Sequence, residues 1–91
     1  ITDYNAARLM VHQAANALDK KQNDTTVKSA MAKKFATDLC YRICDEALQI
    51  HGGYGYLSDY GIEKMVRDCR VHKILEGTNE IMKLIISRKF L

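Results

Sequence analysis

The chain contains no proline, and its five glycines all fall between positions 52 and 77. Elsewhere apolar residues recur at intervals of three and four positions. Proline and glycine are the residues that most often interrupt regular structure, and this spacing places side chains on one face of an α-helix. The sequence therefore predicts an all-α chain, without internal repeats, whose helices are interrupted mainly around the glycines.

The first half of the chain is predicted to form two helices. The first covers about residues 1 to 19 and is followed by a polar loop from Lys20 to Thr26. The second is expected from about Thr26 to Ile50, because its apolar residues form an unbroken row at intervals of four, and a second row beside it indicates a central helix. The stripe expected to face inwards on the first helix consists of Tyr4, Ala7, Val11, Ala14, Ala15 and Leu18.

Glycines separate the long helix from a shorter one. Gly52 and Gly53 can end the long helix, since glycine tolerates the positive φ of a helix C-terminal cap. Residues 51–60 are then predicted to be a loop. A short helix is expected from about Gly61 to Arg70, with Asp59 as its candidate N-cap.

The end of the chain is predicted to form a fourth helix. After a turn over residues 71–77, Thr78 or Asn79 can cap this last helix. Four helices of unequal length, joined by short loops, are typical of an antiparallel bundle. We therefore expect an antiparallel four-helix bundle in which residues 1–91 form a single domain.

Length and charge limit the classes of function. Ninety-one residues make at most one domain with a modest core. The net charge of +3 is small and the basic residues are scattered, whereas a nucleic-acid-binding surface is more basic and more concentrated. No apolar run approaches the roughly 18 residues that a membrane span needs. These features favour a folded domain with neither a nucleic-acid partner nor a membrane span. The chain begins inside a helical pattern without Met, which suggests part of a longer protein.

The first candidate for chemistry is the segment from His51 to Tyr56, which has three glycines in four positions. Glycine lets a backbone approach a ligand closely, and exposed N–H groups can receive phosphate or carboxylate oxygens. The same pattern also occurs where glycines simply end a helix and tyrosines pack on that end. The spacing alone leaves both interpretations open.

The second candidate is Glu76, which lies between Leu75 and Gly77 just before the last helix. A carboxylate beside apolar residues and near a helix N-terminus can serve as a general base. The alternative is an exposed loop glutamate that interacts only weakly with the helix dipole. Here too the local pattern leaves both interpretations open.

Four residues are of zinc-ligand type, Cys40, Cys44, Cys69 and His72. Structural zinc sites more often use closely spaced pairs held by turns, and a free cysteine commonly packs as a small hydrophobic residue. All three cysteines lie on apolar rows, and their odd number argues against a disulfide framework. The sequence thus predicts no metal site. A helix-turn-helix that binds DNA is disfavoured as well, because the last helix is mainly apolar.

Three segments occur in a characteristic order and spacing: QIHGGYGY at 49–56, VRDCR at 66–70 and ILEGTNEI at 74–81. They resemble the C-terminal helical domain of the acyl-CoA dehydrogenase family, and the resemblance extends over essentially the whole chain. Enzymes of this family oxidise an acyl-CoA thioester to the trans-2-enoyl-CoA. A glutamate removes the α-proton while a hydride leaves the β-carbon for the flavin of FAD.

The resemblance implies a role for each matching position. Glu76 would be the base that takes the α-proton, Gly77 would contact the substrate through its backbone, and Leu75 would line the acyl pocket. Two segments would contact FAD, the second of them an FAD held by a neighbouring subunit. The residues implied are Thr78, Asn79 and Glu80 at the last helix, and Gln49, Ile50, His51, Gly52 and Gly53 at the end of the long helix.

The resemblance also implies partners. FAD contacts across subunits imply a homodimer or a dimer-based homotetramer, with electron-transfer flavoprotein as the electron acceptor. The location would be the mitochondrial matrix in a eukaryote and the cytoplasm in a bacterium. Residues 55–60 and 70–77 are most similar to family members that act on isobutyryl-CoA, a short branched-chain thioester. The alternative is a non-enzymatic helical module whose long helix serves only oligomerisation.

Overall fold

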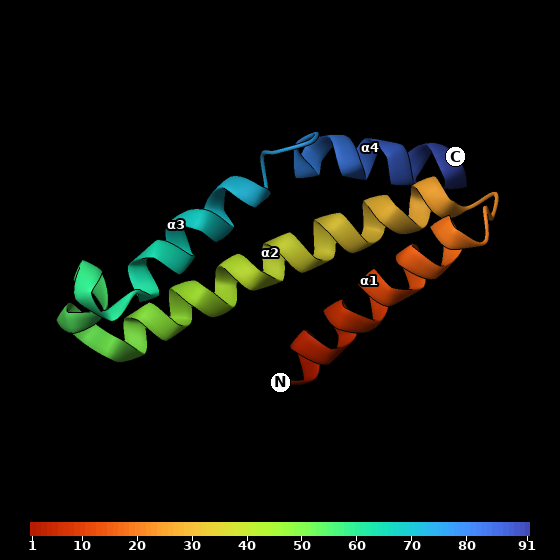
Figure 1. Cartoon of the computed structure of the whole chain (residues 1–91). Helices are drawn as coiled ribbons and strands as arrows, with labels where there is room; N and C mark the ends of the chain where they lie inside the picture. Colours follow the sequence, from red (N-terminus) through yellow and green to blue (C-terminus); the bar gives the residue numbers. More distant parts are fainter.

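The computed structural model describes all residues 1–91 and contains helices and turns but no strand. The long helix α2 (Thr25–His51) lies in the middle, and α1 (Thr2–Asp19) runs antiparallel to it (Figure 1). Helices α3 (Ile62–His72) and α4 (Asn79–Phe90) follow each other back along α2. The predicted all-α fold with four helices is confirmed. Within this chain α1, α3 and α4 each pack against α2 and not against one another, so the molecule is elongated, with extents of 47 × 22 × 19 Å.

Alanines bring α1 close to α2. Ala7, Ala14 and Ala17 are buried on α1, and Ala30 and Ala32 are buried on α2. A methyl side chain permits a short distance between helix axes, which is why these small residues form much of the core. Of the predicted α1 stripe, Ala7 and Ala14 are buried as expected, whereas Ala15 is exposed and Ala17, which was not part of the stripe, is buried.

The larger apolar residues of the predicted α1 stripe are not buried. Tyr4, Val11 and Leu18 are 51%, 48% and 64% exposed, so this part of the prediction is wrong for the chain as it stands. The physical reason is that α1 has a single partner, α2, which covers only the narrow row of alanines. The outer apolar residues of α1 are left without a neighbouring helix.

The loop between α1 and α2 is held by backbone hydrogen bonds and by one hydroxyl group. Thr25 Oγ1 shares its one proton between the carbonyl oxygens of Ala17 (2.9 Å) and Gln22 (2.7 Å). Lys21 adopts a positive φ of 52°, which reverses the chain direction. The observed start of α2 at Thr25 lies one residue before the predicted start.

The predicted loop over residues 51–60 consists of two short 3₁₀ turns, η1 (Gly52–Tyr56) and η2 (Ser58–Tyr60). Gly52 ends α2 with φ of 62°, which confirms its predicted role as a cap. The prediction that Asp59 caps α3 is wrong. Gly61 is the N-cap, its φ of 76° lies in the left-handed region, and no side chain bonds to the start of this helix.

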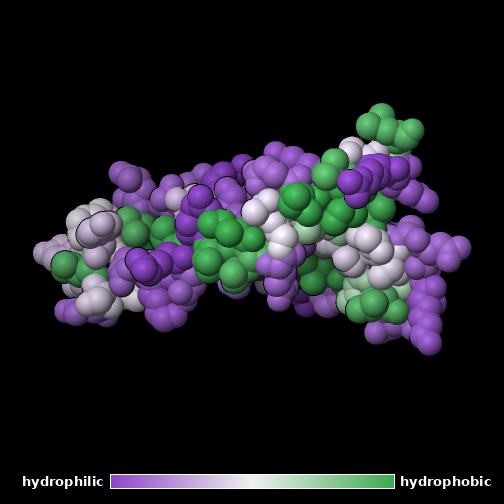
Figure 2. Space-filling model, turned by 90° about the horizontal axis from the view of Figure 1, so that it is seen from above, coloured by the Kyte–Doolittle hydropathy of each residue, from purple (hydrophilic) through white to green (hydrophobic).

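Many large apolar side chains remain exposed. On the face that carries α3 and α4, hydrophobic areas alternate with hydrophilic ones (Figure 2). No helix has the length and apolar character of a membrane span. Exposed apolar areas of this extent are typical of surfaces that contact other protein. On and around these two helices the exposed residues are Met65, Val71, Ile74, Leu75, Ile81, Leu84, Phe90 and Leu91.

The buried glycine of η1 gives a test of the packing at the end of α2. A Cβ at Gly55 would lie 2.8 Å from the Leu48 carbonyl oxygen and 2.7 Å from the Cβ of His51, whereas a Cβ at Gly53 would meet nothing within 4 Å. We expect Gly55→Ala to lower the free energy of unfolding by about 1–3 kcal/mol, because the turn must move away from α2. Urea denaturation followed by circular dichroism measures this change.

Gly53→Ala is the matched control, and we expect it to leave the free energy of unfolding nearly unchanged or slightly higher. Equal losses of stability in the two variants would show that steric contact at Gly55 is not what matters.

Candidate functional site

The turn between α3 and α4, residues 73–78, carries the predicted base and is called here the Glu76 turn. Glu76 and Gly77 both have positive φ, 56° and 92°. A non-glycine residue in the left-handed region is uncommon and persists only where its surroundings hold it. Two hydrogen bonds form where the turn meets α4. Asn79 N–H donates to the Lys73 carbonyl oxygen (3.0 Å), and the side-chain oxygen Thr78 Oγ1 accepts from Ile81 N–H (3.4 Å). The predicted cap at Thr78 is confirmed.

Gly77 is suited to the turn by its conformation. Its φ of 92° is unfavourable for any residue with a side chain. A Cβ here would also lie 2.9 Å from the Cε of Met82, which is the flexible end of a buried side chain and can move aside. The positive φ, rather than lack of space, therefore favours glycine at this position.

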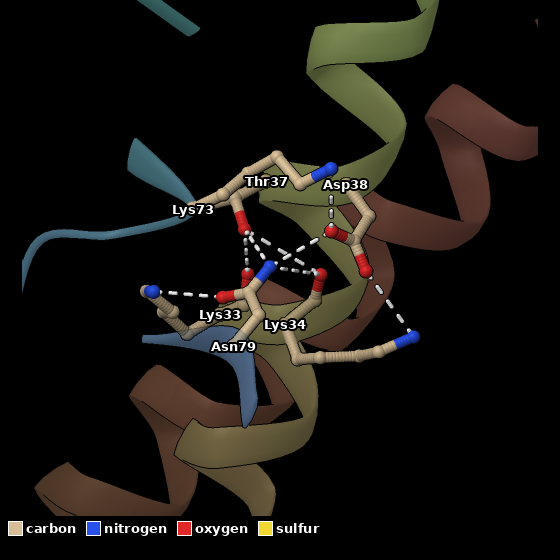
Figure 3. A network of polar contacts seen from close by, with 6 residues as sticks. All are labelled: Lys33, Lys34, Thr37, Asp38, Lys73 and Asn79. Carbon is tan, nitrogen blue, oxygen red and sulfur yellow. Dashed lines mark hydrogen bonds and ion pairs between the residues drawn. The ribbon is translucent and has the colours of Figure 1, made fainter. Parts of the chain in front are cut away.

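Asn79 is the one buried polar residue of the chain, only 3% exposed. Its amide nitrogen donates to Thr37 Oγ1 and Asp38 Oδ1, both at 2.9 Å, and more weakly to the Lys34 carbonyl oxygen at 3.4 Å. Its amide oxygen accepts from Lys33 Nζ at 2.7 Å. All of these partners lie on α2. We call the group shown in Figure 3 the Asn79 cluster; it consists of Lys33, Lys34, Thr37, Asp38, Lys73 and Asn79.

Lys33 joins the Asn79 cluster to the Glu76 turn. Its Nζ donates to the Gly77 carbonyl oxygen at 2.8 Å as well as to Asn79 Oδ1 at 2.7 Å. The bond to the Gly77 carbonyl oxygen holds the peptide group between Gly77 and Thr78, which is next to the one between Glu76 and Gly77. A hydrogen bond from a charged donor is stronger than one between neutral groups. Lys33 thus holds both the turn and the first residue of α4 against α2.

Asp38 is the one acidic residue of the cluster. It forms ion pairs with Lys34 (3.2 Å) and Lys73 (3.4 Å). Burial acts to raise the pKa of Asp38, but the hydrogen bond from Asn79 and the pairing with Lys34 outweigh it, so this pKa lies below the ordinary carboxyl value. Lys73 also lies 5.2 Å from the ring centre of Tyr41, and so contacts α2 twice.

Glu76 itself is exposed, as are Leu75, Gly77 and Glu80. The backbone N–H groups of Gly77 and Thr78 make no hydrogen bond within the chain. The structure therefore brings together a carboxylate, an apolar side chain and two free donors at one rigid turn. This arrangement can accept a proton and receive an oxygen atom of a ligand, but no part of the chain shields it from water.

The other predicted segment, 49–53, lies at the far end of α2 and does not contact α4 (Figure 1). All five of its residues are exposed, and a Cβ at Gly52 or Gly53 would meet no atom within 4 Å. His51 Nδ1 lies 2.8 Å from the Ala47 carbonyl oxygen. Because a carbonyl can only accept, Nδ1 carries the proton, and Nε2 has no partner in the chain. The structure keeps the two predicted groups of FAD contacts apart.

The residues that hold the Glu76 turn were missed by the sequence analysis. Lys33 is 44 positions from Gly77 and Asp38 is 41 positions from Asn79, so no local spacing relates them. Asn79 was predicted to contact FAD, yet its amide and its backbone N–H are both bonded within the chain. No local signal marked Asn79 as buried, because its neighbours in the sequence are Thr78 and Glu80.

The cysteines come together only as a pair. Cys44 Sγ lies 3.7 Å from Cys69 Sγ, and burial, together with this neighbour, raises the pKa of Cys44 to about 11. No group of three or more His, Cys, Asp or Glu side chains is placed to hold a metal ion. An open groove of about 970 Å³ lies between α2, η1 and α3, but none of the residues predicted to contact substrate or FAD lines it.

The lowered pKa of Asp38 predicts a pH dependence of stability. Because this pKa is lower in the folded chain than in the unfolded chain, the carboxylate stabilises the fold above the ordinary carboxyl pKa of about 4. That contribution is lost as the pH falls through the lowered value. We expect Asp38→Asn to be less stable at neutral pH and to lose less stability on acidification. Urea denaturation at a series of pH values between about 7 and 2 measures both effects.

Asp45→Asn serves as the control, because Asp45 is exposed and forms no ion pair. If the free energy of unfolding fell as steeply with decreasing pH in Asp38→Asn as in the unchanged chain, the role given to Asp38 would be contradicted.

The chain is similar to curated dehydrogenases over nearly its whole length. It is 57% identical over 86 residues to the mitochondrial isobutyryl-CoA dehydrogenase of Bos taurus, a match that covers 94% of the chain and 21% of that protein. For the mitochondrial isobutyryl-CoA dehydrogenase of Dictyostelium discoideum the identity is 51%, over 97% of the chain and 21% of the relative. Subunit CarC of the caffeyl-CoA reductase-Etf complex of Acetobacterium woodii is 48% identical, over 94% and 22%. The chain thus spans about a fifth of the length of these relatives.

Solved structures and a family model agree with this similarity. The butyryl-CoA dehydrogenase of Megasphaera elsdenii superposes with a TM-score of 0.93 at 36% identity, over 98% of this chain and 23% of that one. The FAD complex of PigA gives a TM-score of 0.91 at 28% identity, with the same coverage. The model of the acyl-CoA dehydrogenase C-terminal domain matches residues 1–91. The chain therefore belongs to the acyl-CoA dehydrogenase family, an oxidoreductase family, and corresponds to its C-terminal helical domain.

Proposed function

We propose that the protein containing this chain is an FAD-dependent acyl-CoA dehydrogenase in which Glu76 takes the α-proton of the substrate. One observation carries the proposal: Glu76 stands exposed on a left-handed turn that hydrogen bonds hold against α2. Exposed side chains on a rigidly held, strained turn are typical of functional positions. An ordinary surface glutamate would need neither the unusual backbone nor the buried polar contacts beneath it.

The chemistry of an acyl-CoA thioester explains why a fixed carboxylate is needed. Its α-proton is only weakly acidic, so a base must be held within hydrogen-bond reach of it. The rigid Glu76 turn supplies this fixed position, and the free N–H groups of Gly77 and Thr78 can receive an oxygen atom of the substrate. Leu75, which is 46% exposed beside the carboxylate, supplies an apolar contact for the acyl chain.

Two surfaces of the chain are suited to contact FAD. The exposed backbone at Gly52 and Gly53 can approach a flavin nucleotide closely, and Thr78 and Glu80 lie at the start of α4, where N–H groups attract anionic oxygens. Asn79 would act from beneath by holding this helix end. FAD supplies the electron-accepting chemistry that no side chain of the chain has.

The separation of the two FAD surfaces along α2 supports contact with two different FAD molecules. We therefore propose a homodimer or homotetramer in which Gln49 to Gly53 contact the FAD of a neighbouring subunit. The exposed apolar residues on α1 and α3 are available for such contacts. Since the chain alone does not shield Glu76 from water, we expect these 91 residues to be inactive by themselves.

The relatives support three finer proposals. Two of them are isobutyryl-CoA dehydrogenases, so a short branched acyl-CoA is the proposed substrate. One is a subunit of a complex that includes Etf, which supports electron-transfer flavoprotein as the electron acceptor. The eukaryotic relatives are mitochondrial, so we propose the mitochondrial matrix in a eukaryote and the cytoplasm in a bacterium.

The role of Glu76 is tested in the full-length, FAD-loaded protein. We expect Glu76→Gln to lower kcat by about 10²-fold or more, because the amide has nearly the same shape but cannot accept the α-proton. Turnover of isobutyryl-CoA with an artificial electron acceptor measures kcat, and the visible spectrum measures bound flavin. Glu46→Gln, on the exposed side of α2, is the control and should keep full activity. Full activity in Glu76→Gln with flavin bound would exclude Glu76 as the base.

A non-enzymatic helical module is the competing proposal, because exposed apolar residues on α1 and α3 also suit simple oligomerisation. The full-length protein separates the two. We expect it to purify yellow, with the visible absorption bands of oxidised flavin that disappear when isobutyryl-CoA is added without an electron acceptor. A colourless protein that forms oligomers and cannot be loaded with FAD would favour the helical module.

A further inference from the structure

We infer that Lys33 and Asn79 are positioning residues that set the place of Glu76, a role that rests on the proposed function of Glu76. Neither side chain needs to touch the substrate. Together they connect the Glu76 turn and the start of α4 to the middle of α2 (Figure 3). A small shift of this connection would move the carboxylate that α2 itself never contacts.

The contacts of Lys33 are directed at the turn rather than at a surface carboxylate. Its ammonium group has two acceptors, the Gly77 carbonyl oxygen at 2.8 Å and Asn79 Oδ1 at 2.7 Å, and it takes part in no ion pair. Lys34, the next residue, instead pairs with Asp38 and bonds no atom of the turn. Two adjacent lysines on one helix therefore have different partners.

Asn79 makes the connection specific. Its side chain is 3% exposed, and both of its amide atoms are bonded to α2, so a rotation or slide of α4 would leave a buried polar group without a partner. Such a loss is costly, because an unsatisfied buried group keeps its full desolvation penalty. The bonds of Asn79 to Lys33, Thr37 and Asp38 thus favour one position of α4 on α2, and with it one position of the turn.

The left-handed backbone of Glu76 explains why the turn needs the bond from Lys33. A non-glycine residue in this region is less stable than in the right-handed region, so the turn would relax if it were free. The Lys33 bond to Gly77 opposes that relaxation, because it holds the carbonyl oxygen that the turn presents to α2. Without it we expect the carboxylate to sample positions from which proton transfer is slow.

The test compares Lys33→Met with Lys34→Met in the full-length, FAD-loaded protein. We expect Lys33→Met to lower kcat by about 10- to 100-fold with a smaller change in KM, since a misplaced base slows proton transfer. Isobutyryl-CoA deuterated at its α-carbon should then show a larger isotope effect on kcat than in the unchanged enzyme. Lys34→Met should keep kcat within about 2-fold. A loss of folded enzyme would instead lower kcat and leave the isotope effect unchanged.

A second measurement does not depend on turnover. Hydrogen–deuterium exchange of the segment 75–81 reports the bond from Asn79 N–H to the Lys73 carbonyl oxygen, which we expect to open more often in Lys33→Met than in Lys34→Met. Equal exchange and equal kcat in the two variants would overturn the inference. If Glu76→Gln retains full activity, the proposed function fails, while faster exchange in Lys33→Met would still show that Lys33 holds the turn.

Three further variants cover other outcomes. If Lys33→Met fails to fold, Lys33→Gln and Lys34→Gln replace the pair, because the amide removes the charge but keeps a polar side chain, and the same contrast is expected. Lys33→Arg retains donors for both oxygen atoms and should recover part of the kcat lost in Lys33→Met. Equal loss in Lys33→Arg and Lys33→Met, with unchanged exchange in both, would contradict the positioning role.

Discussion

The buried amide of Asn79 is the interaction on which the candidate site depends. A buried polar side chain is costly unless every hydrogen-bonding atom has a partner. Here all partners of the side chain lie on α2, and one of them, Lys33, also donates to the Gly77 carbonyl oxygen of the Glu76 turn. Satisfying this one side chain therefore fixes α4 on α2 and determines where the turn lies.

The other contacts of the turn act in the same direction. Gly77 adopts the positive φ that the turn needs, and Asp38 forms ion pairs with both Lys34 and Lys73. A left-handed Glu76 can persist because these neighbours hold the residues on both sides of it. The exposed carboxylate is thus supported by a polar network around the buried Asn79 rather than by contacts of its own.

The long helix has a different part in each half of the molecule. Its contact with α1 uses buried alanines, and its contact with the turn and α4 uses polar residues. Because α2 contacts all three other helices, it holds them together without a core that all four helices share. This explains why large apolar residues of α1, such as Tyr4 and Leu18, remain exposed, although they were expected to face inwards. It also explains why they are available to other subunits or domains.

The amino-acid sequence by itself determined the four helices, the glycine at the end of α2, the threonine cap of α4 and the family. These follow from periodicity, caps and motifs, which are local properties of the chain. Only the tertiary structure decided which residues hold Glu76 in place, because Lys33 meets Asn79 across 46 positions through the packing of α4 on α2. It also decided that the alanine row of α1 is buried and Asp59 is not a cap, since both depend on which neighbouring element covers a residue.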